Sequence, residues 1–296
     1  MKKNIVIFLV LMMILMLVNS CSDNRETLIL KDVKAGSIEQ KIKNLSTDID
    51  NIGALIISGY INKTDLHFID KLKKISVIDL KNAEILDIET LQKHIFTFNS
   101  SITAIILPRG IDSIGELSFF CMPKLEKVQM PNSIIYIGRA SFSGSEKLHD
   151  ISLSSSLKKI GSNAFDRCKN LKNIKLPESL EIIDSSAFLS CEQLEFIRIP
   201  AKVSYIGRLS FTDCKSLENI IIEGNPTIDY MSFYDAGVKN LYLKSEIPPI
   251  VLNCEFPVSL FGNNSDKINV FVPKGSLYRY KNAPVWKQLW KNMKEE

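Results

Sequence analysis

The sequence predicts an α/β solenoid, in which short strands and turns wind into coils that stack in parallel. The main observation is a repeat with a period of about 23 residues, carried by phenylalanines and leucines in the middle of the chain. The phenylalanines are Phe119, Phe142, Phe165, Phe188 and Phe211, each 23 residues after the last, and Phe233, which comes 22 residues after Phe211. The leucines are Leu125, Leu148, Leu171, Leu194 and Leu217. A unit of this length cannot enclose a core alone, so the units before and after must cover its apolar residues.

Each repeat begins with a short strand. In residues 171–177, Ile174 and Leu176 point to one face, while Asn173 and Lys175 point to the other. Pro177 then ends the strand, since proline has no N–H for a ladder. A glycine such as Gly161 is expected to permit a tight turn. The small residue before each phenylalanine leaves room for rings that stack from coil to coil.

The unit from Leu171 to Cys191, with its Ile174-x-Leu176-Pro177 strand and Ala187-Phe188 pair, resembles the BspA-like leucine-rich repeat family of bacterial surface proteins. The resemblance covers about half the chain and implies a leucine-rich repeat solenoid that acts as an adhesive scaffold and has no cofactor. The sequence departs from the pattern at Ser154, at Asp184 and at Gly144-Ser145. These departures affect single turns and leave the coil intact.

Residues 1–20 are predicted to be a signal peptide, because Lys2 and Lys3 precede a short apolar stretch. Residues 18–21 resemble a bacterial lipobox, which implies that Cys21 is acylated and that residues 21–26 form a lipid-anchored tether. The alternative is an ordinary signal peptide in which Cys21 has no special role. The lipobox interpretation implies an outer-membrane lipoprotein, exposed at the cell surface, that contacts the membrane only through its anchor.

Residues 27–100 are interpreted as irregular, more helical repeats that cap the solenoid of residues 101–245; a separate small domain is the alternative. Ser37 to Gln40 predict a capping box for a helix that buries Ile38, Ile42 and Leu45. Residues 246–296 are predicted to form the other cap, with a strand followed by a helix. Trp286 and Trp290 are expected to cover the last coil from one face of that helix.

Composition and motifs argue against an enzyme or a nucleic-acid binder. Removal of residues 1–20 takes away Lys2 and Lys3 and leaves 35 basic against 33 acidic side chains, with the lysines scattered. The three histidines are far apart, and the chain has no nucleotide-binding, metal-binding or hydrolase motif. Cys168, Cys191 and Cys214 are one repeat apart and are interpreted as buried thiols; a disulfide between neighbours is the alternative.

Two outward rows of side chains are expected along the strands, and they contain the candidate partner-binding residues. These residues are Lys175, Phe196, Arg198, Ile221 and Tyr242. Aromatic, aliphatic and cationic groups of this kind are enriched at binding hot spots. The alternative is that residues 247–266 fold over Ile221 and Tyr242 and bury them.

The resulting functional hypothesis is an adhesin-like surface protein that recognises an extracellular or host protein. A glycan-binding accessory lipoprotein and a structural envelope protein are the alternatives. A flat aromatic platform would favour glycan, whereas the mixed character of the two rows favours a protein partner.

Overall fold

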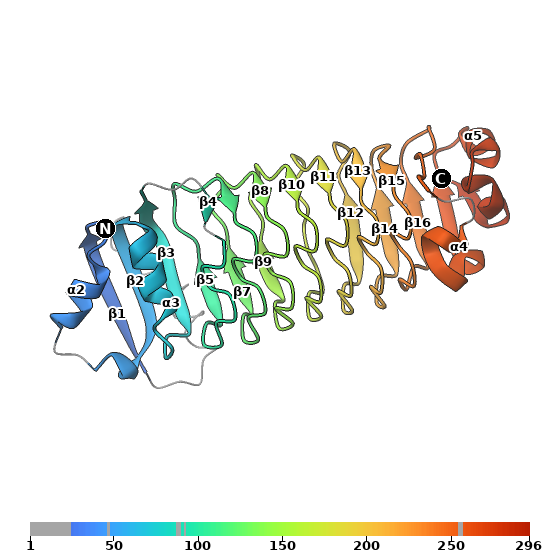
Figure 1. Cartoon of the computed structure of the whole chain (residues 1–296). Helices are drawn as coiled ribbons and strands as arrows, with labels where there is room; N and C mark the ends of the chain where they lie inside the picture. The colour runs from blue at the N-terminus through green and yellow to red at the C-terminus, as the bar shows by residue number, and fades with distance from the viewer. Residues whose placement is uncertain (1–24, 46–47, 87–89, 92, 254–256) are drawn as a thin grey trace, which may run out of the picture.

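The computed structural model is an elongated solenoid with the N-terminal strands at one end and the C-terminal helices at the other (Figure 1). It describes residues 25–45, 48–86, 90–91, 93–253 and 257–296. The predicted signal peptide, Cys21 and Cys254 lie outside the described residues. The predicted α/β solenoid is confirmed, because the strands pair in parallel from coil to coil throughout the array.

Three parallel sheets run along the coils. The first is formed by β1 (Glu26–Val33), β2 (Ile52–Ile61), β3 (Val77–Ile85), β5 (Ala104–Ile106), β7 (Lys127–Gln129) and β9 (Asp150–Ser152). The second is formed by β4 (Thr90–Leu91), β6 (Ser113–Ile114), β8 (Tyr136–Ile137), β10 (Lys159–Ile160), β11 (Ile182–Ile183), β13 (Tyr205–Ile206) and β15 (Thr227–Ile228). The third is formed by β12 (Phe196–Ile199), β14 (Asn219–Ile222), β16 (Asn240–Leu243), β17 (Asn269–Val272) and β18 (Met293–Glu295).

Helices occur toward the two ends of the described chain. The α-helices are α2 (Ile38–Lys43), α3 (Lys63–Asp70), α4 (Val258–Phe261) and α5 (Leu277–Asn282), and the 3₁₀-helices are η1 (Ile49–Asn51), η2 (Gly262–Lys267) and η3 (Trp286–Asn292). Because β1 pairs with β2, β2 with β3 and β3 with β5, the N-terminal strands continue the same sheet as the first regular coils.

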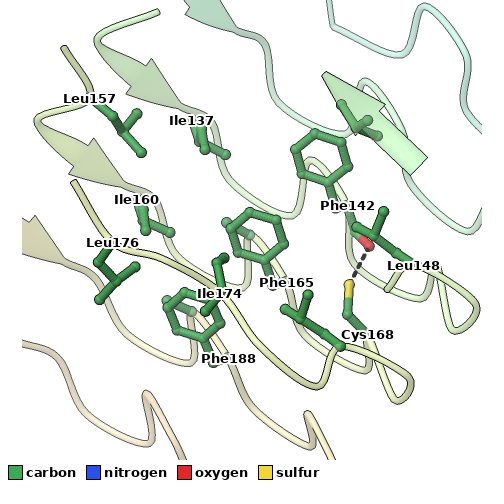
Figure 2. Packing of buried hydrophobic residues seen from close by; sticks show 14 of the residues in the cluster. Ile137, Phe142, Leu148, Leu157, Ile160, Phe165, Cys168, Ile174, Leu176 and Phe188 are labelled. Carbon is green, nitrogen blue, oxygen red and sulfur yellow. Dashed lines mark hydrogen bonds between the residues drawn. The ribbon is translucent and has the colours of Figure 1, made fainter. Parts of the chain in front are cut away.

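A continuous stack of phenylalanine rings fills the centre of the array, as expected from the repeat (Figure 2). Phe142, Phe165 and Phe188 are fully buried, and their ring centroids are 5.3 and 5.2 Å apart with nearly parallel planes. The stack extends beyond the predicted rings to Phe96 at one end and Phe261 at the other. Backbone bonds tie the same turns together, since each of these three phenylalanine N–H groups donates to the next coil.

The cysteine ladder consists of free thiols, as predicted. Cys168, Cys191 and Cys214 are fully buried, and their Sγ atoms donate to the carbonyl oxygens of Phe142, Phe165 and Phe188 at 3.2–3.3 Å. In the preceding coil the Ser145 hydroxyl donates to Phe119 O at 2.8 Å. In these four coils the ladder position therefore holds a small side chain that donates to a buried carbonyl. Burial raises the pKa of all three thiols, to about 12 for Cys214.

The sequence suggested that the glycines of the repeat permit a tight turn, but the structure gives a different reason for them. Gly138, Gly161 and Gly207 do not have positive φ values. A Cβ on Gly138 would lie 2.7 Å from Ile114 O, and one on Gly161 would lie 2.7 Å from Ile137 O. At Gly138 and Gly161 the backbone of the preceding coil thus approaches too closely for a side chain, although Asp184 occupies the same position of the next repeat.

Left-handed turns in the array are made mostly by residues other than glycine. Leu117, Ala140, Asn163, Ser186 and Leu209 occupy the same position in successive repeats and have φ values between 52° and 59°. This conformation is unfavourable for most side chains. The coil-to-coil hydrogen bonds of the same turns hold it in place, for example Leu117 N to Arg139 O and Asn163 N to Ser185 O, both at 3.0 Å.

The predicted capping box at Ser37 is wrong. The Ser37 hydroxyl donates to Lys34 O and makes no cap, and Leu45 is exposed rather than buried. The buried carboxylate of Asp65 serves α2 instead, because it accepts from Gly36 N at 2.6 Å and from Ile38 N at 3.0 Å. Asp65 also completes a capping box with Asn62 at the start of α3.

The predicted C-terminal helix is interrupted. Helix α5 ends at Asn282, Val285 has a φ of 65°, and Trp286 begins the 3₁₀-helix η3. Because the segment is not one α-helix, Trp286 and Trp290 do not share a face. Trp286 is buried and donates its Nε1–H to Pro249 O at 2.7 Å, whereas Trp290 is half-exposed. Only Trp286 acts as a cap.

One buried carboxylate weakens the array. Asp166 Oδ2 accepts from the Ser143 hydroxyl at 3.2 Å, whereas Asp166 Oδ1 has no hydrogen-bond partner among the described residues. Burial raises the pKa of this carboxyl, and the charge of Arg167 and the Ser143 hydrogen bond offset only part of that effect. Keeping this carboxylate charged therefore opposes folding.

Substitution of Asp166 with asparagine is expected to raise the free energy of unfolding by about 1 kcal/mol at pH 7, because it removes a buried charge while keeping the shape. Because the pKa of Asp166 is raised in the folded state, its charge destabilises the wild-type protein increasingly as pH rises from the ordinary carboxyl pKa near 4 through the raised pKa. The advantage of Asp166→Asn should thus vanish below about pH 4. Urea unfolding at pH 3.5 and pH 7 tests this; an advantage that is equal at both pH values would contradict it.

Candidate functional site

Strands β12, β14, β16 and β17 form the platform of the candidate site. Their inward residues, such as Ile197, Ile220 and Leu241, are fully buried, so the alternate side chains face outward. The strand register aligns these side chains in two rows. One row is Phe196, Asn219, Asn240 and Asn269, and the other is Arg198, Ile221, Tyr242 and Phe271. The structure thereby brings Arg198, Ile221 and Tyr242 onto adjacent strands, with Phe196 two residues before Arg198.

Tyr242 and Phe271 form an aromatic pair at the end of the second row. Their ring centroids are 4.6 Å apart and their planes differ by 11°, while Lys244 Nζ lies 5.5 Å from the Tyr242 centroid. Neighbouring strands are separated by nearly the same distance, so the rings stack along the solenoid axis. One face of each ring packs on the other ring, and the ring edges point away from the sheet.

Arg198 is held between two carboxylates from neighbouring coils. Its Nη1 lies 2.6 Å from Glu178 Oε1, and its Nε lies 3.0 Å from Glu223 Oε1. The two carboxylates raise the pKa of Arg198, chiefly through the hydrogen bond from Arg198 to Glu178. The guanidinium is therefore oriented and neutralised, and it presents a flat polar surface rather than a free positive charge.

A polar ladder lies beside the aromatic pair. Asn240 Nδ2 donates to Asn219 Oδ1 at 2.9 Å, and Asn269 Nδ2 donates to Asn240 Oδ1 at 3.2 Å. Phe196 continues this row and is 40% exposed, which is unusual for a ring on a rigid strand. The row thus places an exposed aromatic side chain next to amides that are already fixed by hydrogen bonds.

Lys175 lies at a break in the sheet. Its coil contributes no strand to the first or third sheet, only the isolated bridge between Asn173 and Phe196. A recess of about 510 Å³ opens at this point, and Lys175, Pro177 and Glu178 form part of its lining together with Ile151 and Leu153. Lys175 therefore borders the candidate surface on its N-terminal side.

The described part of the segment after Ile247 does not bury the candidate residues. Val251 bridges to Ile228 on the second sheet, and Pro249 is held by Trp286. Ile247 and Ile250 are exposed, and Ile221 and Tyr242 remain partly exposed. The described part of this segment therefore does not cover Ile221 and Tyr242, contrary to the alternative considered from the sequence.

Phe271 is the member of the site that sequence reasoning missed. The strand containing it was expected, but Phe271 follows Tyr242 at an interval longer than one repeat. The available signal was the pattern of the strand: Val270 and Val272 alternate with Phe271 as Leu241 and Leu243 alternate with Tyr242.

Within the described ranges, no three side chains of His, Cys, Asp or Glu gather as a metal-binding group. His67 and His149 are exposed, and each ring forms a hydrogen bond with a nearby backbone carbonyl. None of the helices between Arg25 and Glu296 that the structure describes is long and apolar enough to cross a membrane.

The fold and the outward rows define a leucine-rich repeat scaffold that offers a side-chain surface on a rigid array. The family model for the BspA type leucine rich repeat region matches six copies, at residues 37–149, 71–188 and 136–255. The matches together cover more than half of the chain, and the protein belongs to this family. No curated protein matches the sequence.

Three solved structures illustrate the similarity. A leucine-rich repeat protein of T. pallidum is 29% identical, with a TM-score of 0.42, over 52% of this chain and 66% of that one. A leucine-rich cell surface protein of Faecalibacterium prausnitzii is 17% identical, with a TM-score of 0.37, over 63% of this chain and 61% of that one. A leucine-rich repeat protein of Bacteroides ovatus is 20% identical, with a TM-score of 0.34, over 64% and 67%. This chain thus covers less than two thirds of the length of each of the first two proteins.

Proposed function

We propose that this protein is a lipid-anchored, adhesin-like surface protein that binds an extracellular or host protein through the outward rows of β12, β14, β16 and β17. The observation that carries the proposal is the grouping of Phe196, Ile221, Tyr242 and Phe271 on adjacent strands. These side chains are exposed or partly exposed, and aromatic residues beside an arginine are the types enriched at interface hot spots. Because the strands are rigid, little conformational entropy is lost when a partner docks.

The geometry of the rings favours a protein over a glycan. A sugar stacks its C–H groups on an open aromatic face, whereas the faces of Tyr242 and Phe271 that meet are covered by each other. The exposed ring edges and the aliphatic side chain of Ile221 suit side-chain packing instead. Glycan binding and a purely structural envelope role are therefore outcomes of the test.

The double substitution Phe196→Ala with Tyr242→Ala is expected to weaken binding of a protein partner at least tenfold. Truncation of one hot-spot side chain commonly removes about 2 kcal/mol or more of binding free energy, and a tenfold change in affinity needs less than that. The measurement is surface plasmon resonance against a panel of purified matrix proteins, alongside a glycan array. Tyr278→Ala is the matched control, since Tyr278 is an exposed aromatic residue on α5, outside the two rows.

The outcomes of this experiment separate the hypotheses. Unchanged affinity in the double variant, or an equal loss in Tyr278→Ala, would place the interface elsewhere. Binding to the glycan array alone would favour the glycan hypothesis. A chain that binds neither panel but whose loss alters the envelope would favour the structural role.

The proposed anchor has its own test. If Cys21 is acylated, the wild-type protein should fractionate with membranes and Cys21→Ala should be released into the soluble fraction, because several acyl chains hold a protein far more tightly than one. Metabolic labelling with palmitate supplies the chemical readout. Membrane association of Cys21→Ala equal to that of wild type would refute the anchor, and protease treatment of whole cells tests surface exposure.

A further inference from the structure

A pocket toward the N-terminal end of the solenoid has a basic lining. It has a volume of about 440 Å³, and its described lining includes Arg25, Lys73, Lys74 and Lys124 and one carboxylate, that of Asp50. The described lining therefore carries three more positive than negative charges.

Parallel pairing of the strands brings these side chains together. Arg25 precedes β1, Asp50 precedes β2, Lys74 precedes β3 and Lys124 precedes β7, so all lie at the amino ends of neighbouring parallel strands. Only the coil of β5 separates Lys74 from Lys124. Strands are spaced by about 4.8 Å, so the two backbone positions are about 10 Å apart, a gap that two lysine side chains can span to reach one small anion.

Polar groups fix the wall between the two lysines. The Ser76 hydroxyl donates to Gly53 O at 3.1 Å, and the Thr103 hydroxyl donates to Ser76 O, also at 3.1 Å. Ser101, whose hydroxyl bonds to Asn99 Oδ1 at 3.0 Å, completes this side of the pocket. Because these hydroxyl protons are already used, the ammonium groups are the donors that remain for a ligand.

The pocket lysines differ from lysines elsewhere on the array. Lysines such as Lys158 and Lys169 pair with a glutamate on an adjacent coil, at 3.7 and 2.9 Å. Over the described ranges, no ion pair involves Lys73, Lys74 or Lys124; the Lys73 ammonium donates to Asp70 O at 3.0 Å. Neighbouring cations repel one another, so an anion bound between them would relieve that repulsion.

We propose that this pocket binds a phosphate group. A phosphate monoester carries a charge between about −1.5 and −2 near pH 7 and has three acceptor oxygens, which matches several converging ammonium donors better than a planar carboxylate with one charge. The group can come from an anionic lipid headgroup or from a soluble phosphate. Only the lipid source rests on the proposed anchor: Arg25 is four residues after Cys21, and four extended residues span at most about 14 Å.

Amine footprinting of the intact protein locates the site and identifies the source. The protein is reconstituted in phosphatidylcholine vesicles, with or without phosphatidic acid, whose headgroup is a phosphate monoester, and acetylated briefly in chloride or in inorganic phosphate at equal ionic strength. Mass spectrometry then compares Lys74 and Lys124 with the exposed Lys202. Slower labelling of the two pocket lysines, by at least about threefold relative to Lys202, is expected when the pocket is occupied at more than two thirds.

The two arms report different sources. Protection in inorganic phosphate supports a soluble phosphate ligand, and protection only with phosphatidic acid supports a lipid headgroup. Protection in neither arm, or equal protection of Lys202, would overturn the proposal. None of these outcomes depends on protein-partner binding, so failure here is distinguishable from failure of the proposed function.

Matched charge variants give an independent measurement. Lys74→Gln with Lys124→Gln should weaken phosphate binding in calorimetry at least about tenfold, since hydrogen bonds between charged groups are roughly twice as strong as neutral ones. Lys172→Gln with Lys202→Gln changes the net charge equally at exposed positions outside the pocket and should leave affinity unchanged. Asp50→Asn should strengthen binding. Equal losses in the two double variants would show that net charge alone, not the pocket, attracts the anion.

Discussion

Replacement of Phe165 with alanine is expected to lower the free energy of unfolding by about 3–5 kcal/mol, the usual range for a fully buried phenylalanine. Phe165 is 0% exposed and stacks on Phe142 and Phe188, so its removal opens a cavity against two coils at once. Because coils depend on their neighbours, the loss should also divide the array into two less cooperative parts.

Urea unfolding, followed by circular dichroism and by intrinsic fluorescence, measures both effects. Phe98→Ala is the control, since Phe98 is 66% exposed and lies outside the stack. A destabilisation of Phe165→Ala no greater than that of Phe98→Ala would mean that the ring stack does not stabilise the solenoid. Unfolding curves that coincide in the two probes would show that cooperativity survives the cavity.

Replacement of Gly207 with alanine is expected to lower the free energy of unfolding by about 3 kcal/mol, at the upper end of the range for overpacking. The added Cβ would lie 2.4 Å from Ser185 N and 2.6 Å from the carbonyl carbon of Asp184. Both atoms belong to the backbone of the preceding coil, which cannot move without breaking its own hydrogen bonds. The coils on either side of Gly207 must therefore separate.

Gly275→Ala is the informative comparison. Gly275 has a φ of +83°, but a Cβ there would meet no atom within 4 Å, so only the left-handed conformation opposes alanine, at about 1–2 kcal/mol. Thermal unfolding of the two variants separates contact from conformation. A smaller loss in Gly207→Ala than in Gly275→Ala would contradict the close approach between coils.

The interior of the array could be predicted from the sequence because its period is nearly constant. Phe119 through Phe233 stack as the spacing indicates, and the strand residues pair in the expected rows. Phe96 also keeps the period of the repeat, but the small residue expected before the ring is replaced by Ile95, which concealed it. Phe261 follows Phe233 at an interval longer than one repeat, so the period could not reveal it.

The parts that depend on tertiary contacts could not be predicted from spacing. Ser37 has the sequence of a capping residue, yet Asp65, far along the chain from Ile38, caps the helix after folding. The glycines occupy the expected places for a reason that only neighbouring backbones reveal. In the candidate site, Phe196, Arg198, Ile221 and Tyr242 followed from the rows, whereas the carboxylates around Arg198 and the stacking of Phe271 depend on side-chain contacts between coils.

The buried thiols have a consequence for how opening of the array can be observed. Each of Cys168, Cys191 and Cys214 lies in its own coil and is shielded from solvent, and its raised pKa keeps it in the unreactive thiol form. A thiol-directed reagent can therefore modify each one only while its coil is transiently open. The native cysteines are thus three built-in reporters, spaced one turn apart, from which the opening free energy of successive turns can be obtained without introducing a label.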